Sequence, residues 1–479
     1  MREGSHTPEE KGVPRASGPR DDNLSIDRSC YWLARRPPRA PEPLTGELAA
    51  DVAIVGAGFT GLWTALFLKL LEPGLTVAVL DGELAGYGAS GRNAGIAGES
   101  IDHSHELAIA HFGVDEAREL ARLGRENLDE MEAFLAERGI DAGWDRAGQL
   151  TVALQPEHLA ALDAMRRAAE RVGIGDLRIL SAEETRAELA SPLYRGALLS
   201  PRNALVDPIR LIEGLRAEAL RLRVRIAERS AVMAFAFPRD RVRVSTAGGA
   251  VTARRVVLAT NAYSHHLFPR LRNRFLPLYD YILVSDPLTP AQRAEIGWRN
   301  RRGVVDARTF FNYYRPTDDG RILFGTSEAV YYPGNRVDAA CDHSTAHEAS
   351  LRESFRRHFP ALADLSFPYA WGGPIASTTR LTPFFGLLEG RVAYGLGYTG
   401  HGIGSTRLAG KILAHLTLER SSPLLDLSLV RRPPFPYPPE PLRRLAVAAV
   451  TRALRRVDAG GSPGLLLRAL ERMGIGFSS

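Results

Sequence analysis

The stretch Asp51-Val-Ala-Ile-Val-Gly56-Ala-Gly58-Phe-Thr-Gly61 decides the fold of this chain. Its first five residues are apolar enough to predict a buried strand, and a helical pattern runs from Phe59 to Leu71. A second apolar run, residues 76–80, predicts the next parallel strand. A strand, a glycine turn, a helix and a strand within about thirty residues are typical of a Rossmann-like dinucleotide-binding domain.

The glycine turn follows the pattern GxGxxG, and each glycine has its own physical role. Gly56 permits the tight turn, Gly58 lets the backbone approach a pyrophosphate, and Gly61 lets the helix pack closely on the strand. Asp81, at the end of the second strand, can accept hydrogen bonds from ribose hydroxyls. The predicted dinucleotide contacts are Gly56, Ala57, Gly58, Phe59, Thr60, Gly61 and Asp81. The motif alone does not choose between NAD and FAD, and a glycine turn without a ligand is the alternative.

A second glycine cluster follows at residues 88–95. Its amides and hydroxyl can wrap phosphate and flavin, with a cation nearby, whereas an ordinary surface loop is the alternative. The candidate residues are Gly88, Ser90, Gly91, Arg92 and Asn93.

Composition excludes several classes of protein. The chain has 479 residues, 45% hydrophobic and 24% charged, so it is neither disordered nor collagen-like, and its length suggests two or three domains. The 61 basic and 55 acidic residues give a net charge of +6 that is scattered, which argues against nucleic-acid binding. Cys30 and Cys341 form neither a disulfide framework nor a zinc site, and no spacing predicts a metal site. A cytoplasmic location without a transmembrane segment is expected, because the longest uncharged run, residues 52–68, is interrupted by glycines.

Further blocks make the chain resemble a known family. They are NALVDPIRLIEGL at 203–215, RVVLATNAYS at 255–264, YYRPTDDGRILFGTSE at 313–328, YAWGGPIASTTRLTPFFG at 369–386 and VAYGLGYTGHGIGSTRLAGKILA at 392–414. Together with the N-terminal stretch they resemble the FAD-dependent oxidoreductases of the D-amino-acid-oxidase superfamily, in particular the gamma-glutamylputrescine oxidase-like branch.

The resemblance implies an α/β fold in which an α+β substrate domain with an antiparallel sheet is inserted into a discontinuous FAD-binding domain. The FAD domain is expected at 31–98, 205–270 and 370–420, and the substrate domain at 99–204 and 271–369. Residues 1–30 are expected to be a flexible tail. Residues 421–479 are expected to be a proline-rich linker and a basic C-terminal helix, which packs on the body or, as the alternative, lies on a membrane surface.

The resemblance also implies where the flavin binds. Ala259 and Thr260 are expected to contact the cofactor. The glycine-rich loop before the last helix of the FAD domain is expected to lie against the ring, and the dipole of that helix favours negative charge on the reduced flavin. Its candidate residues are Gly397, Tyr398, Thr399, Gly400, His401 and Gly402. His401 is the candidate for proton transfer, and FAD is expected to be non-covalent because neither cysteine lies in a matching motif.

Departures from the family bear on the substrate. Where relatives that oxidise α-amino acids carry an arginine that clamps the carboxylate, this chain has Ile375, which favours an amine. Arg315 and Arg380 are candidates to replace the clamp, and Asp280 or Glu328 to balance an ammonium. The predicted substrate-binding residues are Tyr281, Tyr313, Tyr314, Arg315, Trp371 and Arg380. The alternative for the aromatic residues is the core of the substrate sheet, and for the two arginines it is a surface ion pair. No lysine lies between Lys69 and Lys411 to promote reaction with oxygen, so the electron acceptor, oxygen or another, stays open.

The expected activity is oxidation of an amine, such as an acylated polyamine, by hydride transfer to flavin N5, after which the imine hydrolyses to an aldehyde. The alternatives are an amino-acid oxidase or dehydrogenase of the sarcosine, glycine or D-amino-acid type, a flavin monooxygenase, and a non-enzymatic flavoprotein that binds a partner through its basic C-terminal helix. The oligomeric state stays open.

Overall fold

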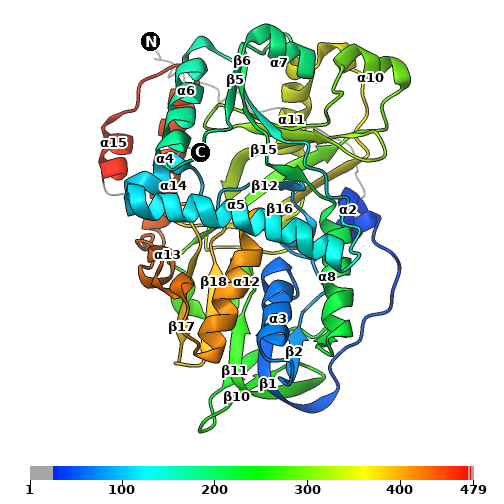
Figure 1. Cartoon of the computed structure of the whole chain (residues 1–479), viewed down its shortest axis with the longest axis vertical. Coiled ribbons are helices and arrows are strands. Elements are labelled where there is room, and N and C mark those ends of the chain that lie inside the picture. Colours follow the sequence, from blue (N-terminus) through cyan, green and yellow to red (C-terminus); the bar gives the residue numbers. More distant parts are fainter. Residues whose placement is uncertain (1–24, 473–474, 476–479) are drawn as a thin grey trace, which may run out of the picture.

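A computed structural model describes residues 25–472 and residue 475, and Figure 1 shows two sheets stacked along the long axis of the molecule. The first sheet has the spatial order β17 (Phe384–Leu388), β18 (Val392–Leu396), β11 (Gly249–Leu258), β1 (Gly46–Val55), β2 (Val77–Leu80) and β8 (Arg225–Ala227), with β10 (Val242–Ser245) and β9 (Ala234–Ala236) attached to β11. Between β1 and β2 runs α3 (Phe59–Leu71), which is buried on nearly all sides. These elements confirm the Rossmann-like unit that the glycine pattern predicts.

Parallel pairing brings three strand ends to one edge. Val55 of β1 is paired with Leu80 of β2 and with Leu258 of β11. The glycine turn, Asp81 and Ala259 therefore emerge side by side from the carboxyl end of the sheet, where ligands of this architecture bind.

The second sheet has the order β16 (Tyr369–Ser377), β12 (Leu276–Val284), β15 (Ile322–Tyr331), β14 (Asn312–Pro316), β13 (Gly303–Asp306), β4 (Gln149–Ala153), β6 (Gly196–Ser200) and β5 (Arg178–Leu180). Apart from the parallel pair β4–β13, its neighbours are antiparallel. Since β16 pairs along its whole length with β12, residues 370–377 belong to this sheet, whereas the sequence placed them in the FAD domain.

Helices cover both sheets. They are α4 (His105–Phe112), α5 (Val114–Glu137), α6 (Pro156–Arg171), α7 (Ala182–Glu188), α8 (Pro208–Arg221), α9 (Ser264–Leu267), α10 (Pro290–Ile296), α11 (Thr345–His358), α12 (Gly402–Leu418), α13 (Ser428–Arg431), α14 (Leu442–Asp458) and α15 (Leu465–Arg472). Helix α12 packs on α3, and the long α5 crosses the molecule between the two sheets (Figure 1). A small pair, β3 (Ile96–Ala97) and β7 (Ala204–Leu205), lies apart from the two sheets.

The segment before β1 differs from its prediction. Residues 26–34 contain the short helices α1 (Ile26–Ser29) and α2 (Tyr31–Ala34), which bury Cys30, Tyr31 and Trp32 against the second sheet. The flexible tail predicted to reach residue 30 therefore ends earlier, because these apolar side chains pack, and residues 1–24 lie outside the described residues. Within the described part of the chain, no helix is long and apolar enough to cross a membrane.

Candidate active site

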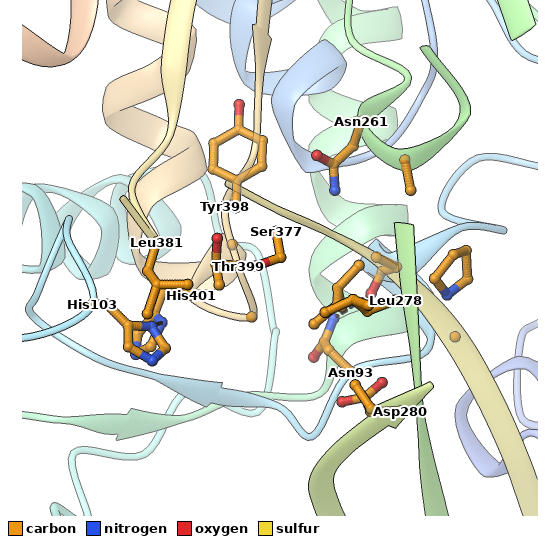
Figure 2. A pocket seen from close by; sticks show the side chains of 18 of the residues that line it. Asn93, His103, Asn261, Leu278, Asp280, Ser377, Leu381, Tyr398, Thr399 and His401 are labelled. Atoms are coloured by element: carbon orange, nitrogen blue, oxygen red, sulfur yellow. Dashed lines mark hydrogen bonds between the residues drawn. The ribbon is translucent and has the colours of Figure 1, made fainter. Parts of the chain in front are cut away.

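A cavity of about 1120 Å³ lies between the carboxyl edge of the first sheet and one face of the second. Figure 2 shows Asp280, Leu278 and Asn93 on one side of it and His103, His401 and Leu381 on the other, with Ser377 and Thr399 between them. The predicted cofactor residues that line it are Gly56, Gly58, Phe59, Thr60, Asp81, Gly88, Ser90, Arg92, Asn93, Ala259, Thr260, Tyr398, Thr399, Gly400, His401 and Gly402. The remaining four, Ala57, Gly61, Gly91 and Gly397, do not line it.

The glycine turn is packed too tightly for side chains. Gly56 has φ +107°, and a Cβ there would lie 2.7 Å from the carbonyl oxygen of Ala259. A Cβ on Gly61 would lie 1.8 Å from the carbonyl oxygen of Gly56, which is a backbone clash. Gly61 thus allows α3 to approach β1, as the motif predicts, and Gly56 permits the turn.

Asp81 holds the turn in place. Its carboxylate accepts hydrogen bonds from the backbone N–H of Ala57 (2.6 Å) and of Glu83 (2.9 Å). Burial raises the pKa of Asp81 to about 6. Because the carboxylate also lines the cavity, its remaining lone pairs are available to a ribose hydroxyl.

The second glycine cluster is built into the turn and the second sheet. Ser90 Oγ accepts a hydrogen bond from Phe59 N (3.0 Å) at the start of α3. The Arg92 guanidinium pairs with Asp342 (2.6 Å), and Arg92 Nη2 is buried without a hydrogen-bond partner among the described residues. The indole nitrogen of Trp371 donates to the carbonyl of Arg92 (2.9 Å). This segment is therefore a fixed wall of the cavity.

The loop before α12 presents backbone groups to the cavity. Thr399 and Gly400 both have positive φ, of +47° and +89°, and a Cβ on Gly400 would meet nothing within 4 Å. Helix α12 has no side-chain cap, so the amides of its first turn, beginning at Gly402, are left for a ligand. Asn261, in the turn expected to contact the cofactor, accepts a hydrogen bond from Gly397 N (3.1 Å) and fixes this loop.

Two histidines meet in the cavity wall. His103 Nδ1 and His401 Nδ1 are 3.1 Å apart, so one nitrogen donates and the other accepts, and the contact holds a single proton. Burial lowers the pKa of both rings, that of His103 well below its usual value. His401 is therefore a neutral imidazole oriented by His103, a partner from a distant segment that no motif indicated, and its role in proton transfer stays a prediction.

These residues fit FAD. A narrow glycine turn at the start of α3, a carboxylate at the end of β2 and the uncapped N-terminus of α12 lie along one continuous cavity. The first two suit the adenosine and pyrophosphate, and the third suits the pyrimidine edge of a flavin. Cys30 and Cys341 are buried and do not line the cavity.

Most of the predicted substrate residues do not reach the cavity. Tyr313 lines it, but Tyr281 and Tyr314 point to the opposite face of the second sheet and pack in its core. Their hydroxyls are bound there, Tyr281 to the carbonyl of Cys341 (3.0 Å) and Tyr314 to Tyr194 (2.6 Å). Alternation along a strand explains the error, because neighbouring residues face opposite sides.

Trp371, Arg315 and Arg380 are also wrongly predicted as substrate contacts. Trp371 is buried beneath the N-terminal helices. Arg315 donates to the carbonyl oxygens of Gly95 (2.6 Å) and Val206 (2.8 Å), so it ties two loops together. Arg380 donates to the carbonyl of Arg432 (2.6 Å) and does not line the cavity. Neither arginine replaces a carboxylate clamp.

Asp280 is the carboxylate that the cavity presents to a substrate. The hydroxyl of Tyr313 donates to Asp280 Oδ2 (2.9 Å), and no salt bridge neutralises this carboxylate among the described residues. Desolvation raises the pKa of Asp280 to about 6. Ile375, on the neighbouring strand β16, also lines the cavity.

The other charged candidates are engaged elsewhere. Glu328 pairs with Arg455 of α14 (2.6 Å) and does not line the cavity, so it is not the ammonium partner. Lys69 donates to the carbonyls of Pro73 and Leu75, and Lys411 pairs with Glu130. Neither lysine is near the cavity, so the described residues place no lysine beside the flavin site.

Comparison with known proteins agrees with this site. The sequence model of the DAO family, described as FAD dependent oxidoreductase, matches residues 51–416. Gamma-glutamylputrescine oxidoreductase of Escherichia coli is 33% identical over 86% of this chain and 93% of that protein. A probable oxidoreductase OrdL of Haemophilus influenzae is 31% identical over 82% of this chain and 88% of that protein. The crystal structure of glycine oxidase from Geobacillus kaustophilus superposes with a TM-score of 0.66 at 21% identity over 78% of this chain and 96% of that one, which shows a shared fold. With the glycine turn, Asp81 and the uncapped α12 in place, the chain belongs to the FAD dependent oxidoreductase (DAO) family and binds FAD.

Proposed function

We propose that this FAD-dependent amine or amino-acid oxidoreductase acts on an amine whose reacting nitrogen is remote from any carboxylate. The observation that carries the proposal is the charge pattern of the cavity. It presents the unneutralised carboxylate of Asp280, which suits an ammonium, and it presents isoleucine at position 375, where a carboxylate clamp would need a guanidinium.

The chain's own groups bind and orient such a substrate. Asp280 attracts the protonated amine into the cavity, and the hydroxyl of Tyr313 holds the carboxylate in place. With a pKa of about 6, Asp280 is ionised at neutral pH and can accept the proton that the amine loses before it reacts. FAD, when bound, supplies the acceptor for the hydride that leaves the carbon beside nitrogen. The imine so formed adds water, its C–N bond breaks, and an aldehyde and ammonia are released.

The name of the Escherichia coli relative supports the substrate class. A gamma-glutamylated putrescine carries its free amine several bonds from any carboxylate, which matches a cavity with the carboxylate of Asp280 and with isoleucine at position 375. Acylated polyamines are therefore the first compounds to test.

The test is an anaerobic screen that follows bleaching of the bound flavin. N-acyl putrescines and simple alkylamines are expected to bleach it, and sarcosine, glycine and D-alanine are expected to react more slowly by about tenfold or more. Fast bleaching by the amino acids alone would refute the proposal. Bleaching by NADPH alone would identify a flavin monooxygenase. Mixing the reduced enzyme with oxygen then shows whether oxygen or another acceptor takes the electrons.

The variant Ile375→Arg provides an internal check. A guanidinium at this lining position would repel an ammonium and offer a clamp to a carboxylate. We expect KM for amines to rise and KM for amino acids to fall. An unchanged ratio would show that position 375 does not face the substrate.

A further inference from the structure

The C-terminal extension forms part of the cavity wall. Helix α14 lies beyond residue 416, where the family match ends, and five of its residues line the same cavity as the flavin site. They are Ala446, Val447, Val450, Thr451 and Leu454. Four of them, from Val447 to Leu454, fall on one face of the helix, and that face is only half-buried although it points inward. It borders open space rather than packed core.

Polar contacts anchor α14 at its start. The buried guanidinium of Arg443 donates to Asn335 Oδ1 and Asn273 Oδ1, both at 2.5 Å, and to the carbonyl of Pro438 (2.9 Å). The preceding linker is also held, because Tyr437 N donates to the carbonyl of Asn273 (2.7 Å). The linker residues 435–438 line the cavity as well.

Polar contacts also anchor the end of α14. Asp458 accepts hydrogen bonds from the backbone N–H of Thr309 and of Phe310, both at 2.9 Å, and Arg455 pairs with Glu328 (2.6 Å). A helix of 17 residues fixed at both ends spans about 25 Å. Its middle is therefore held over the cavity as a wall. Figure 1 shows the C-terminal helices beside the part of the molecule that contains the second sheet.

Facing α14 is one face of the second sheet. Alternate residues of neighbouring strands line the cavity there, among them Ser327 and Ala329 of β15, Phe311 and Tyr313 of the β14 segment, Val305 and Ala307 of the β13 segment and Leu198 of β6. Most of these side chains are apolar. Two carboxylates of this face are paired, Asp306 with Arg308 (2.7 Å) and Glu328 with Arg455 (2.6 Å).

Asp280, the proposed partner of the substrate ammonium, lies next to the space between α14 and the second sheet. Asp280 of β12 lies next to the β15 segment that contains Ser327 and Ala329, where the pairing of the two strands is irregular. The same segment carries Glu328, which α14 holds through Arg455. A substrate with its nitrogen at Asp280 therefore has its far end directed along the sheet beneath α14.

We propose that α14 walls a chamber for the far end of the amine, and that this far end is an extended, uncharged, apolar group. The inference rests on the proposed amine oxidation and narrows its substrate class to amines with an uncharged far end, which excludes the charged gamma-glutamyl group in the name of the Escherichia coli relative. The residues that the family model matches, 51–416, supply the flavin chemistry, and α14 determines which far end of the amine fits.

Calorimetric titration of the holoenzyme with n-butylamine, n-octylamine and 8-aminooctanoate tests the chamber without requiring turnover. Each buried methylene is worth about a threefold to fourfold gain in affinity. With its four additional methylenes buried, n-octylamine should bind roughly 80- to 250-fold more tightly than n-butylamine, and 8-aminooctanoate should lose most of that gain because its carboxylate has no partner there. Equal affinity for the two alkylamines would overturn the inference.

Two variants and a control locate the effect. Val450→Trp and, independently, Leu454→Trp fill the chamber. Each should lower the ratio of the affinities for n-octylamine and n-butylamine at least tenfold and change the affinity for n-butylamine by no more than about twofold. Leu445→Trp is the matched control, since Leu445 lies on the opposite, exposed side of α14 and does not line the cavity. Bound FAD, read from absorbance, reports that each variant is folded. Equal behaviour of the control and both variants would overturn the inference.

Parallel anaerobic bleaching with the same amines separates the two proposals. If the affinity for amines depends on chain length and on the α14 substitutions as expected but no amine bleaches the flavin, the proposed amine oxidation is refuted and the chamber is supported. If amines bleach the flavin with no dependence on chain length or on α14, the chamber fails while the proposed function stands. As a direct measure of position, alkylation of Val450→Cys should be slowed by n-octylamine and not by n-butylamine, and equal protection would count against the chamber.

Discussion

Replacing Asp280 by asparagine is the sharpest test of the site, because one change should weaken substrate binding and stabilise the fold. Asp280→Asn keeps the shape of the side chain and removes the charge. The hydroxyl of Tyr313 can still donate to the amide oxygen, so the local geometry is retained. Loss of binding would then report the charge rather than a collapsed wall.

The expected changes in KM and in the free energy of unfolding follow from two independent quantities. A hydrogen bond between charged groups is worth about 1.5–3 kcal/mol, so KM for the amine should rise roughly 10- to 150-fold. The pKa of Asp280 is raised from 3.8 to about 6, and at about 1.4 kcal/mol per pKa unit the ionised carboxylate costs the fold at most about 3 kcal/mol. Asp280→Asn removes that cost.

The pH dependence has a definite sign. Since the pKa is raised by folding, the cost is absent below about pH 4, grows as the pH rises and is complete above about pH 7. The variant should therefore melt at a higher temperature than the wild type at pH 7.5, and the difference should shrink at pH 4.5. For the wild type, binding of the amine should strengthen as the pH rises through about 6, because Asp280 then becomes ionised.

Thermal unfolding at the two pH values and steady-state kinetics with one amine complete the assay. Asp240→Asn is the control, because Asp240 is exposed and distant from the cavity lining, and it should change neither quantity. An unchanged KM in Asp280→Asn would refute the assignment of Asp280 as the ammonium partner. A lower melting temperature at pH 7.5 would refute the claim that its charge is uncompensated.

Three further outcomes are expected. Tyr313→Phe removes the hydrogen bond that lowers the pKa of Asp280, so the pH midpoint for amine binding should move upward, and an unmoved midpoint would contradict the contact. Gly61→Ala, whose Cβ would clash with backbone, should abolish FAD binding, whereas Gly74→Ala, whose Cβ would meet nothing within 4 Å, should retain it, as absorbance at the flavin bands shows. His103→Leu removes the partner of the neighbouring histidine in the cavity and should lower kcat about tenfold at unchanged FAD content, while full activity would exclude a positioning role.

The glycine turn shows what local sequence determines. A strand, a turn with glycines at fixed spacing and a helix are set by interactions among residues close in the chain, so the pattern located α3 at Phe59–Leu71 and placed Asp81 beside the turn. The loop before α12 was found in the same way, because its crowded glycines have a local conformational reason.

Packing between segments distant in the chain determines which residues on the substrate side face the cavity and which are buried in the core. Alternation predicts that Asp280 and Tyr281 face opposite sides of β12, but only the helices that cover each face determine which side is core and which is cavity. Trp371 is covered by helices α1 and α2, and Arg315 is bound to the carbonyl of Gly95. Both contacts join segments more than two hundred residues apart in the chain.

The sequence by itself determined the family and the cofactor, and its short motifs with local causes located the turns that line the cavity. Only the tertiary structure decided that His103 meets His401, that Asp280 faces the cavity and that α14 lines it. The physical reason is that these relations depend on which surfaces far apart in the chain bury one another, and no local pattern of residues encodes that choice.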